Sequence, residues 1–353
     1  MRRVAVLGAN GFIGNRTVEM LRASGLFEVR PVVRRASAAA LPCRFDLEVH
    51  VADGRDSEAL VKAFHGCDSV VVAIAGDPAT IVNTIDPVVR AARAASVRRL
   101  VYLSSASVHG QSPLPGTDES SPLSSRQPLA YNNAKVAAER RLMRLASDNP
   151  EIVVLRPGIV FGPRSQWVGG WADELLAGEA YTVEGAQGVC NAIYVDDLVR
   201  AIVLAIDTAD ARGAYLLGQK EQVAWRDFCE PIAAALGVPF ETVPDHSAAE
   251  AQPERGPSLR ERLRPVIRRV RPFIPAKVRG RVRAAIHAGR ARADGGGRAV
   301  SLERALLHTA RHRPSWDRAR TELGYEPLVS FDEGLKRSIA WLAFAGYPVK
   351  GAP

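Results

Sequence analysis

Short aliphatic runs alternate with segments of helical periodicity through most of this chain. Runs rich in Val, Ile and Leu are typical of strands buried on both faces, and the stretches between them are long enough for helices. The pattern predicts strands over 4–7, 29–33, 70–75, 100–103, 151–155 and 193–195, and helices over 15–24, 82–95, 132–146 and 196–205. Because strands that alternate with helices form parallel sheets, we predict an α/β protein with a doubly wound parallel sheet.

The alternation stops in two later stretches, which indicates a second structural unit. We expect residues 1–165, with sheet contributions from about 189–218, to form the core. Residues 166–188 and 219–353 are expected to form a smaller C-terminal lobe, which includes an insertion at about 255–298.

The net charge of +9 is concentrated in that insertion. Residues 255–298 hold 14 Lys and Arg against Glu261 and Asp294, a local charge of +12, which leaves −3 on the remainder. A dedicated nucleic-acid-binding domain spreads its basic residues over its folded body, so no nucleic acid is expected as a partner. The insertion has two interpretations: a solvated surface segment, or a broken amphipathic helix that contacts anionic lipid or a polyphosphate.

Cysteine spacing and apolar run lengths limit the environment. Cys43, Cys67, Cys190 and Cys229 are scattered, with no C-x-x-C pair and no nearby histidine cluster, so we expect reduced thiols and no metal site. No run approaches the roughly 20 apolar residues of a membrane-spanning helix. These features predict a cytoplasmic protein, which is peripheral to a membrane if the insertion binds lipid.

A glycine-rich turn follows the first predicted strand and precedes the first predicted helix. It reads Gly8-Ala9-Asn10-Gly11-Phe12-Ile13-Gly14. Gly8 permits a tight turn, Gly11 allows close approach of a pyrophosphate, and Gly14 allows the helix to pack closely on the sheet. The spacing G-x-x-G-x-x-G differs from G-x-G-x-x-G, but its strand-turn-helix context predicts a Rossmann-like dinucleotide site that uses Asn10, Phe12 and Ile13 as well.

The end of the second strand predicts which dinucleotide binds. NAD-preferring sites place an acidic residue there, whereas this chain has Arg34 and Arg35. A guanidinium favours a 2′-phosphate through charge and bidentate hydrogen bonding, so NADP(H) is favoured, with NAD(H) as the alternative. Asp53 is a candidate for the adenine amino group, and Ala73 and Ala75 for the floor under the dinucleotide.

A second motif, Tyr131-Asn132-Asn133-Ala134-Lys135, indicates proton transfer. Tyr131 and Lys135 are four residues apart on a predicted helix, so their side chains share one face. A phenol with a pKa near 10 is a weak base at neutral pH, and a neighbouring ammonium lowers that pKa. Ser105, at the end of a strand, is placed to polarise a substrate oxygen.

Together these motifs resemble the extended short-chain dehydrogenase/reductase family, the NAD(P)-dependent epimerase/dehydratase group. The resemblance rests on Gly8 to Gly14, Ser104 to Gly110, Tyr131 to Lys135, Leu155 to Pro163 and Tyr194 to Asp197. It runs from residue 1 to about 240 and resumes at 319–341. It implies a dinucleotide-binding core, a substrate-binding lobe and a homodimer formed through paired helices.

The resemblance also implies residue roles. Tyr131 is the acid/base, Lys135 lowers its pKa and holds the nicotinamide ribose, and Ser105 hydrogen-bonds the substrate, with Ser104 and Ser107 as substitutes. Pro157 and Gly158 lie beside the cofactor, and Asn83 matches an asparagine that supports a proton-relay water.

Departures from the family pattern narrow the activity. Sugar-nucleotide 4,6-dehydratases have Thr-Asp-Glu where this chain has Ser105-Ala106-Ser107, which disfavours dehydration. Sugar-nucleotide epimerases usually have Asn in place of Ile159 and a diphosphate-binding Arg in place of Cys190. Both losses favour the branch similar to 3β-hydroxysteroid dehydrogenases and dihydroflavonol reductases.

We therefore predict an NADP(H)-dependent oxidoreductase that moves a hydride between nicotinamide and a carbonyl or secondary alcohol of a small or lipid-like substrate. The substrate is expected to contact Ser107, Ile159, Trp167 and Trp171, with Tyr194 at the rim of the site. The alternatives are a nucleotide-sugar or lipid-linked-sugar epimerase and a non-catalytic NADPH-binding regulator.

Overall fold

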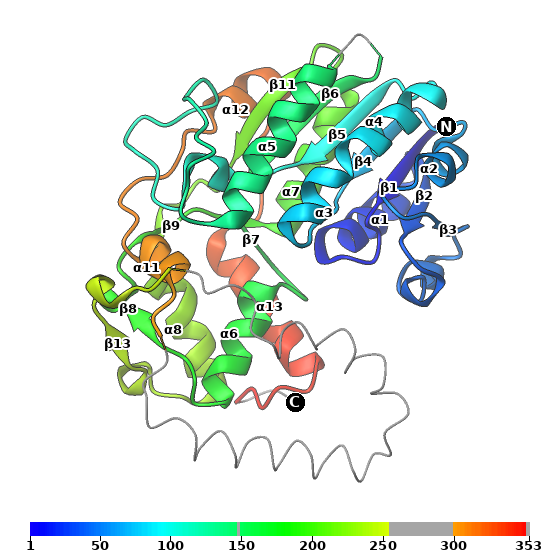
Figure 1. The fold of residues 1–353 in the computed structure, drawn as a ribbon. Helices are drawn as coiled ribbons and strands as arrows, with labels where there is room; N and C mark the ends of the chain where they lie inside the picture. The colour runs from blue at the N-terminus through cyan, green and yellow to red at the C-terminus, as the bar shows by residue number, and fades with distance from the viewer. Residues whose placement is uncertain (147–148, 254–298, 351–353) are drawn as a thin grey trace.

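Seven parallel strands form the central sheet of the computed structural model, which describes residues 1–146, 149–253 and 299–350 (Figure 1). The strands are β1 (Arg2–Leu7), β2 (Phe27–Val33), β3 (His50–Val51), β4 (Ser69–Val72), β5 (Arg99–Leu103), β6 (Glu151–Pro157) and β11 (Gly213–Leu217). Their order is β11-β6-β5-β4-β1-β2-β3, and every neighbouring pair is parallel.

Helices cover both faces of this sheet (Figure 1). They are α1 (Phe12–Ser24), α2 (Ser57–Phe64), α3 (Pro78–Asn83), α4 (Ile85–Ala94), α5 (Ala130–Leu145) and α7 (Val195–Asp207). Val4 and Val6 of β1 join one core cluster with α1 and α7, whereas Ala5 and Leu7 join the other with α2, α4 and α5. Successive residues of a strand face opposite sides. The predicted doubly wound α/β fold is therefore confirmed.

One predicted helix is divided in two. The stretch 82–95 was expected to be continuous, but α3 ends at Asn83 and α4 begins at Ile85. Pro87 has no N–H to donate to the carbonyl of Asn83, four residues earlier, so the helix cannot run through this point undisturbed. Proline is tolerated in the first turn of α4, where amide groups have no intrahelical partner.

The glycine turn lies where the strand order reverses, between β1 and β4. The amides of Gly8 and Ala9 both donate to the Val32 carbonyl, at 3.0 and 3.2 Å. Gly8 has φ +95°, and a Cβ there would lie 2.7 Å from the Ala73 carbonyl oxygen. A Cβ on Gly14 would lie 2.3 Å from the Gly8 carbonyl oxygen. Only glycine fits these two positions.

Most of the remaining elements form a lobe beyond the carboxyl ends of the sheet strands (Figure 1). Its helices are α6 (Gln166–Leu176), α8 (Trp225–Leu236), α11 (Leu302–His308) and α13 (Phe331–Phe344), whereas α12 (Asp317–Leu323) lies beside β11 of the sheet. Its paired strands are β7 (Ile159–Phe161) with β10 (Ala192–Tyr194), β9 (Val189–Cys190) with β12 (Val223–Ala224), and β8 (Thr182–Val183) with β13 (Asp245–His246). Short 3-10 helices are η1 (Ala36–Ala38), η2 (Pro42–Phe45), η3 (Ala106–His109), η4 (Glu184–Ala186), η5 (Phe240–Thr242) and η6 (Ala248–Glu250).

The basic insertion at about 255–298, and with it the predicted lipid contact, lies outside the described residues. Among the helices that the structure describes, none has the length and apolar character needed to cross a membrane.

Candidate active site

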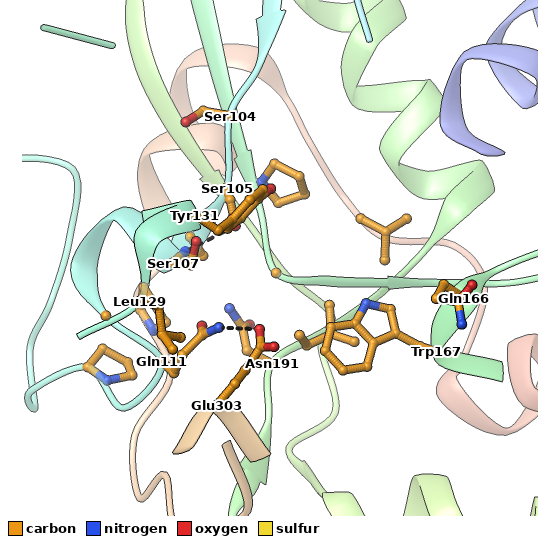
Figure 2. A pocket seen from close by; sticks show the side chains of 18 of the residues that line it. Ser104, Ser105, Ser107, Gln111, Leu129, Tyr131, Gln166, Trp167, Asn191 and Glu303 are labelled. Carbon is orange, nitrogen blue, oxygen red and sulfur yellow. Dashed lines mark hydrogen bonds between the residues drawn. The ribbon is translucent and has the colours of Figure 1, made fainter. Parts of the chain in front are cut away.

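Ser105 and Tyr131 meet at the carboxyl edge of the sheet (Figure 2). Ser105 comes two residues after β5, where it precedes η3, and its Oγ accepts a hydrogen bond from the Ser107 amide at 3.2 Å. Tyr131 lies in the first turn of α5, and its hydroxyl shares a hydrogen bond with the Ser105 side chain. The structure thus brings together the two groups that the sequence analysis assigned to the substrate oxygen.

Lys135 is buried behind Tyr131. Its ammonium donates to the Leu103 carbonyl at 2.8 Å and lies 5.8 Å from the centre of the Tyr131 ring. Burial lowers the pKa of Lys135 to about 8, and the Glu139 carboxylate acts in the opposite direction. Lys135 therefore carries a positive charge at neutral pH without lining the open cavity.

The protonation state of Tyr131 differs from the sequence-based expectation. Burial raises the pKa of Tyr131 to about 12, the Ser105 hydrogen bond lowers it, and the Glu303 carboxylate raises it. The lowered pKa expected from Lys135 is not found, because burial disfavours phenolate and the Lys135 ammonium is directed at a carbonyl. The Tyr131 phenol is consequently protonated at neutral pH.

Ser104 belongs to a buried charge network beside the site. Its hydroxyl donates to the Glu139 carboxylate, which also forms an ion pair with Arg156 at 2.7 Å. The Arg156 guanidinium lies 3.1 Å from Nε2 of His109, whose pKa falls to about 4 through burial and this positive charge. Because Ser104 is committed to Glu139, it is poorly placed as a substitute for Ser105.

A cavity of about 680 Å³ opens in front of Ser105 and Tyr131 (Figure 2). Sequence-predicted residues that line it are Phe12, Ile13, Ser104, Ser105, Ser107, Tyr131, Pro157, Gly158, Ile159 and Trp167. Trp167 lies across the cavity from Tyr131. The Ser107 Oγ is buried with no hydrogen-bond partner among the described residues, so a polar ligand group can be accommodated there.

Three predicted residues lie elsewhere. Tyr194 is 2% exposed and packs edge-on against Phe161 at 5.5 Å, so its expected position at the rim of the site is wrong. Trp171 lines a neighbouring cavity of the lobe instead of this one. Asn83 is exposed at the end of α3 and does not line the cavity, which places it away from a proton relay.

The run Tyr194-Val195-Asp196-Asp197 has a structural role. Asp196 forms a bidentate ion pair with Arg16 of α1, at 2.6 and 2.8 Å. Asp197 is buried, and its carboxylate accepts from the amides of Leu328 and Val329. The run therefore fastens α7 to α1 and to the segment before α13.

The start of α1 has the features of a pyrophosphate site. Asn10 and Gly11 are exposed, and Gly11 is the N-cap of α1, which no side chain of a described residue caps. A Cβ on Gly11 would stand 3.3 Å from the Gly8 carbonyl oxygen, in space that glycine leaves open. Free amides and the positive end of the helix dipole favour anions, so a dinucleotide fits this turn.

The other predicted cofactor residues surround the same edge. Arg34 and Arg35 are exposed and directly follow Val33, the last residue of β2. Asp53 follows β3, and its pKa is lowered first by its hydrogen bond with Arg55 and also by the charge of Arg34. Ala73 and Ala75 follow β4, half-buried and exposed respectively. Their contacts with a cofactor stay predictions.

The cavity also contains polar residues that the sequence analysis missed. Arg164 donates to Asn15 Oδ1 at 2.7 Å, and burial together with the charge of Arg44 lowers its pKa. Glu303 of α11 accepts from Gln111 at 2.8 Å (Figure 2). Asn191 also lines the cavity, and its side chain lies next to Gly158. Arg164 directly follows Gly162-Pro163, a signal that could have been used; Glu303 has no motif.

Comparison with known proteins places these features in a family. The model of the NAD dependent epimerase/dehydratase family matches residues 4–218. The chain is 34% identical over 256 residues to 3-diazoavenalumate denitrifying reductase of Streptomyces sp, covering 67% of this chain and 82% of that one. It is 26% identical over 346 residues to 4-hydroxy-2-methyl-3-oxo-4-farnesyl-3,4-dihydroquinoline-1-oxide ketoreductase of Stigmatella aurantiaca, covering 94% of each.

The fold agrees with this assignment. The crystal structure of gox2253 superposes with a TM-score of 0.72 at 23% identity, over 99% of this chain and all of that one. Because the family model matches more than half of the chain, the protein belongs to the NAD dependent epimerase/dehydratase family of extended short-chain dehydrogenases/reductases and is an NAD(P)-dependent oxidoreductase.

Proposed function

We propose that the enzyme is an NADP(H)-dependent reductase/dehydrogenase of carbonyl groups and secondary alcohols. The observation that carries this proposal is the meeting of Ser105, protonated Tyr131 and the start of α1 around one cavity of about 680 Å³. A proton donor and a dinucleotide turn on the same cavity are the requirements of carbonyl reduction.

The side chains have distinct roles in reduction. A bound reduced nicotinamide supplies the hydride for the carbonyl carbon. Tyr131 donates its hydroxyl proton to the carbonyl oxygen, which its raised pKa permits at neutral pH. Ser105 hydrogen-bonds the same oxygen and orients it. Lys135 acts as a positioning residue, because its buried ammonium holds the Leu103 carbonyl, two residues before Ser105, beside the Tyr131 ring.

Cofactor binding rests on positive charge at two places, of which only the first distinguishes NADP(H) from NAD(H). Arg34 and Arg35 are exposed directly after β2, and we assign them to the 2′-phosphate because a guanidinium suits that group. Arg164 and Arg44 approach the start of α1 through Asn15, with Glu19 as the acidic partner of Arg44. The second pair supports binding of the pyrophosphate, which NADP(H) and NAD(H) share.

The substrate end of the cavity favours a molecule without a nucleotide handle. Ile159 and Trp167 supply apolar surface, and Ser107 supplies a hydroxyl. Cys190 is 2% exposed and outside the cavity lining, so it offers no diphosphate contact. The relative from Stigmatella aurantiaca is named as a ketoreductase, which supports a carbonyl substrate here.

The test identifies the nucleotide first and the reaction second. The purified protein is denatured and any released nucleotide is identified, while native protein is titrated with NADPH and NADH. Exchangeable binding that prefers NADPH, followed by NADPH oxidation with ketones, is the expected result. Stoichiometric, tightly held NAD⁺ overturns the proposal and favours the sugar epimerase; binding without turnover of any carbonyl or sugar favours the regulator.

A further inference from the structure

A second cavity of about 350 Å³ adjoins the catalytic one on the lobe side. Gln166, Trp167 and Glu303 line both cavities, so they form a shared wall. The remainder of the second cavity comes from α6, α8, α11 and the N-cap residue of α11, Ser301, which belong to the lobe. A molecule whose carbonyl reaches Tyr131 therefore has a place for a second group on the far side of Trp167.

The walls of the second cavity are aromatic. Trp225 lies at the centre of a ring cluster, with ring-centre distances of 5.4 Å to Trp167, 5.9 Å to Phe228 and 5.4 Å to His308. Trp171 completes the lining, fixed by a hydrogen bond from its Nε1 to the Cys229 carbonyl at 3.0 Å. Aromatic walls at these separations favour flat, ring-containing ligands through offset and edge contacts.

The positive charges on these walls are compensated. Arg304 pairs with Glu174 at 2.8 Å and stacks on the Tyr181 ring at 4.2 Å. Burial lowers the pKa of His308 to about 3, and its Nδ1 accepts the Val183 amide, so the imidazole is neutral. Among the described lining residues, no unpaired cation remains to hold a phosphate or carboxylate. A neutral ligand matches this surface better than a nucleotide does.

One polar group of the wall lacks a partner. Trp225 is 3% exposed, and its Nε1–H has no hydrogen-bond acceptor among the described residues. An unsatisfied buried donor costs stability that an acceptor from a ligand would recover. An ether or carbonyl oxygen on the ligand is a suitable acceptor.

We propose that the second cavity is a substrate subsite for a neutral, ring-bearing arm with a hydrogen-bond acceptor, attached to the carbonyl that Tyr131 protonates. This inference rests on the proposed reductase function. It assigns the substrate class: a carbonyl compound whose aromatic or other flat apolar ring extends past Trp167 to Trp225.

Gly170 of α6 provides a way to fill the subsite. It lines the second cavity, and a Cβ there would meet the amide end of Gln166, at 2.4 Å, which is the tip of a flexible exposed side chain. Gly170→Leu therefore occupies the subsite at little cost to the helix, and Gly170→Ala occupies less of it. Gly169→Ala is the control on the same helix, because its Cβ would make ordinary contacts of 3.7 to 3.9 Å with Tyr347 and Trp341.

The measured quantity is the ratio of kcat/KM for 4-phenylcyclohexanone to kcat/KM for cyclohexanone, with NADPH. The wild-type enzyme should favour the phenyl compound. Gly170→Leu should lower the ratio by roughly tenfold or more, Gly170→Ala should lower it less, and Gly169→Ala should leave it unchanged. A ratio near one in the wild type, or an equal ratio in Gly170→Leu, overturns the proposal.

Trp225→Phe tests the donor separately, because it keeps an aromatic ring and removes Nε1–H. The ratio of kcat/KM for 4-(4-methoxyphenyl)cyclohexanone to that for 4-phenylcyclohexanone should fall several-fold in this variant. An unchanged ratio removes the acceptor from the proposed substrate class.

Calorimetric titration with 4-phenylcyclohexanone, with and without saturating NADP⁺, separates the subsite from the reductase activity. Binding that Gly170→Leu weakens by roughly tenfold, without any turnover, supports the subsite and contradicts the proposed function. Absence of binding under both conditions overturns the subsite, whatever small ketones the enzyme reduces.

Discussion

The carboxyl edge of the sheet and the aromatic cavity of the lobe face each other across Trp167, but they are built differently. At the sheet edge, Gly8, Ser105 and Tyr131 each lie within a short sequence motif at a strand end or helix start. In the lobe, Trp225 and Arg304 lie on separate helices far apart in the chain. Local sequence therefore specifies the chemistry, whereas tertiary packing specifies what is recognised.

The two regions also differ in the charged groups that they contain. The sheet edge buries an ammonium on Lys135 and the Glu139–Arg156 ion pair next to the reacting oxygen site. The lobe cavity pairs Arg304 with Glu174 and keeps His308 neutral. A preorganised electrostatic environment serves a reaction in which charge develops, and a compensated aromatic surface serves binding of a neutral group.

Tyr131→Phe tests the catalytic side chains at the sheet edge and should have the largest effect of the substitutions considered. Loss of the proton donor should reduce kcat by about 10³-fold, while NADPH binding and binding of 4-phenylcyclohexanone stay within about threefold of wild type. Steady-state kinetics and calorimetric titration measure both. Tyr194→Phe is the control, because that ring packs away from the cavity; a comparable loss there would mean that the cavity has been wrongly assigned.

Glu139→Gln should lower the free energy of unfolding by roughly 3 kcal/mol, because it leaves the buried Arg156 charge without its anion. Urea unfolding at neutral pH measures the change. The exposed pair Asp86–Arg141 serves for comparison, and Asp86→Asn should cost less than about 1 kcal/mol. Equal costs for the two variants would contradict the distinction between buried and exposed pairs in this fold.

His308 should make the lobe acid-sensitive. Its pKa is lowered from 6.5 to about 3, so as pH falls below 6.5 the unfolded chain takes up a proton that the folded chain excludes. Stability is therefore present above pH 6.5 and lost towards lower pH, by roughly 2 kcal/mol between pH 6.5 and pH 5.

Urea unfolding at these two pH values should give a smaller loss for His308→Asn than for wild type. His109 contributes a loss of the same sign from the sheet side. If His308→Asn loses as much stability as wild type between pH 6.5 and pH 5, other groups cause the acid sensitivity.

Arg34→Gln separates recognition of the 2′-phosphate from recognition of the pyrophosphate at the sheet edge. It has the smallest expected effect. The Kd for NADPH should rise by roughly tenfold, because a charged contact with the 2′-phosphate is lost. Fluorescence titration with NADH should show a change of less than about twofold. Equal weakening of both nucleotides would place Arg34 at the pyrophosphate, the location proposed for Arg164.

Most of the sheet could be predicted from the sequence, because aliphatic runs such as those around Val71 and Val101 are unambiguous when both faces are buried. The division of the helix at Asn83 was missed because its cause, the absent N–H of Pro87, acts four residues upstream. Tyr194 was misplaced because its motif resembles a site but serves packing, through Asp196, Asp197 and the contact with Phe161.

The candidate site could be predicted where function and local structure coincide. Tyr131 was expected from its spacing to Lys135, Ser105 from its place at a strand end, and both from the family resemblance; the structure brings the two side chains together. Glu303 was missed because it approaches Tyr131 only through the packing of α11, which no periodicity indicates. The pKa of Tyr131 could not be anticipated either, since it depends on burial and on the hydrogen bond from Lys135 to Leu103.

The shared wall of Gln166, Trp167 and Glu303 has a consequence for the evolution of substrate specificity. Substitutions at lobe positions such as Gly170 or Leu307 reshape the second cavity without moving the proton donor. Descendants of one ancestor can thus keep the same reaction and diverge in the molecules they accept. Such an arrangement is expected to give a family whose members share the catalytic residues at the strand ends but act on different substrates.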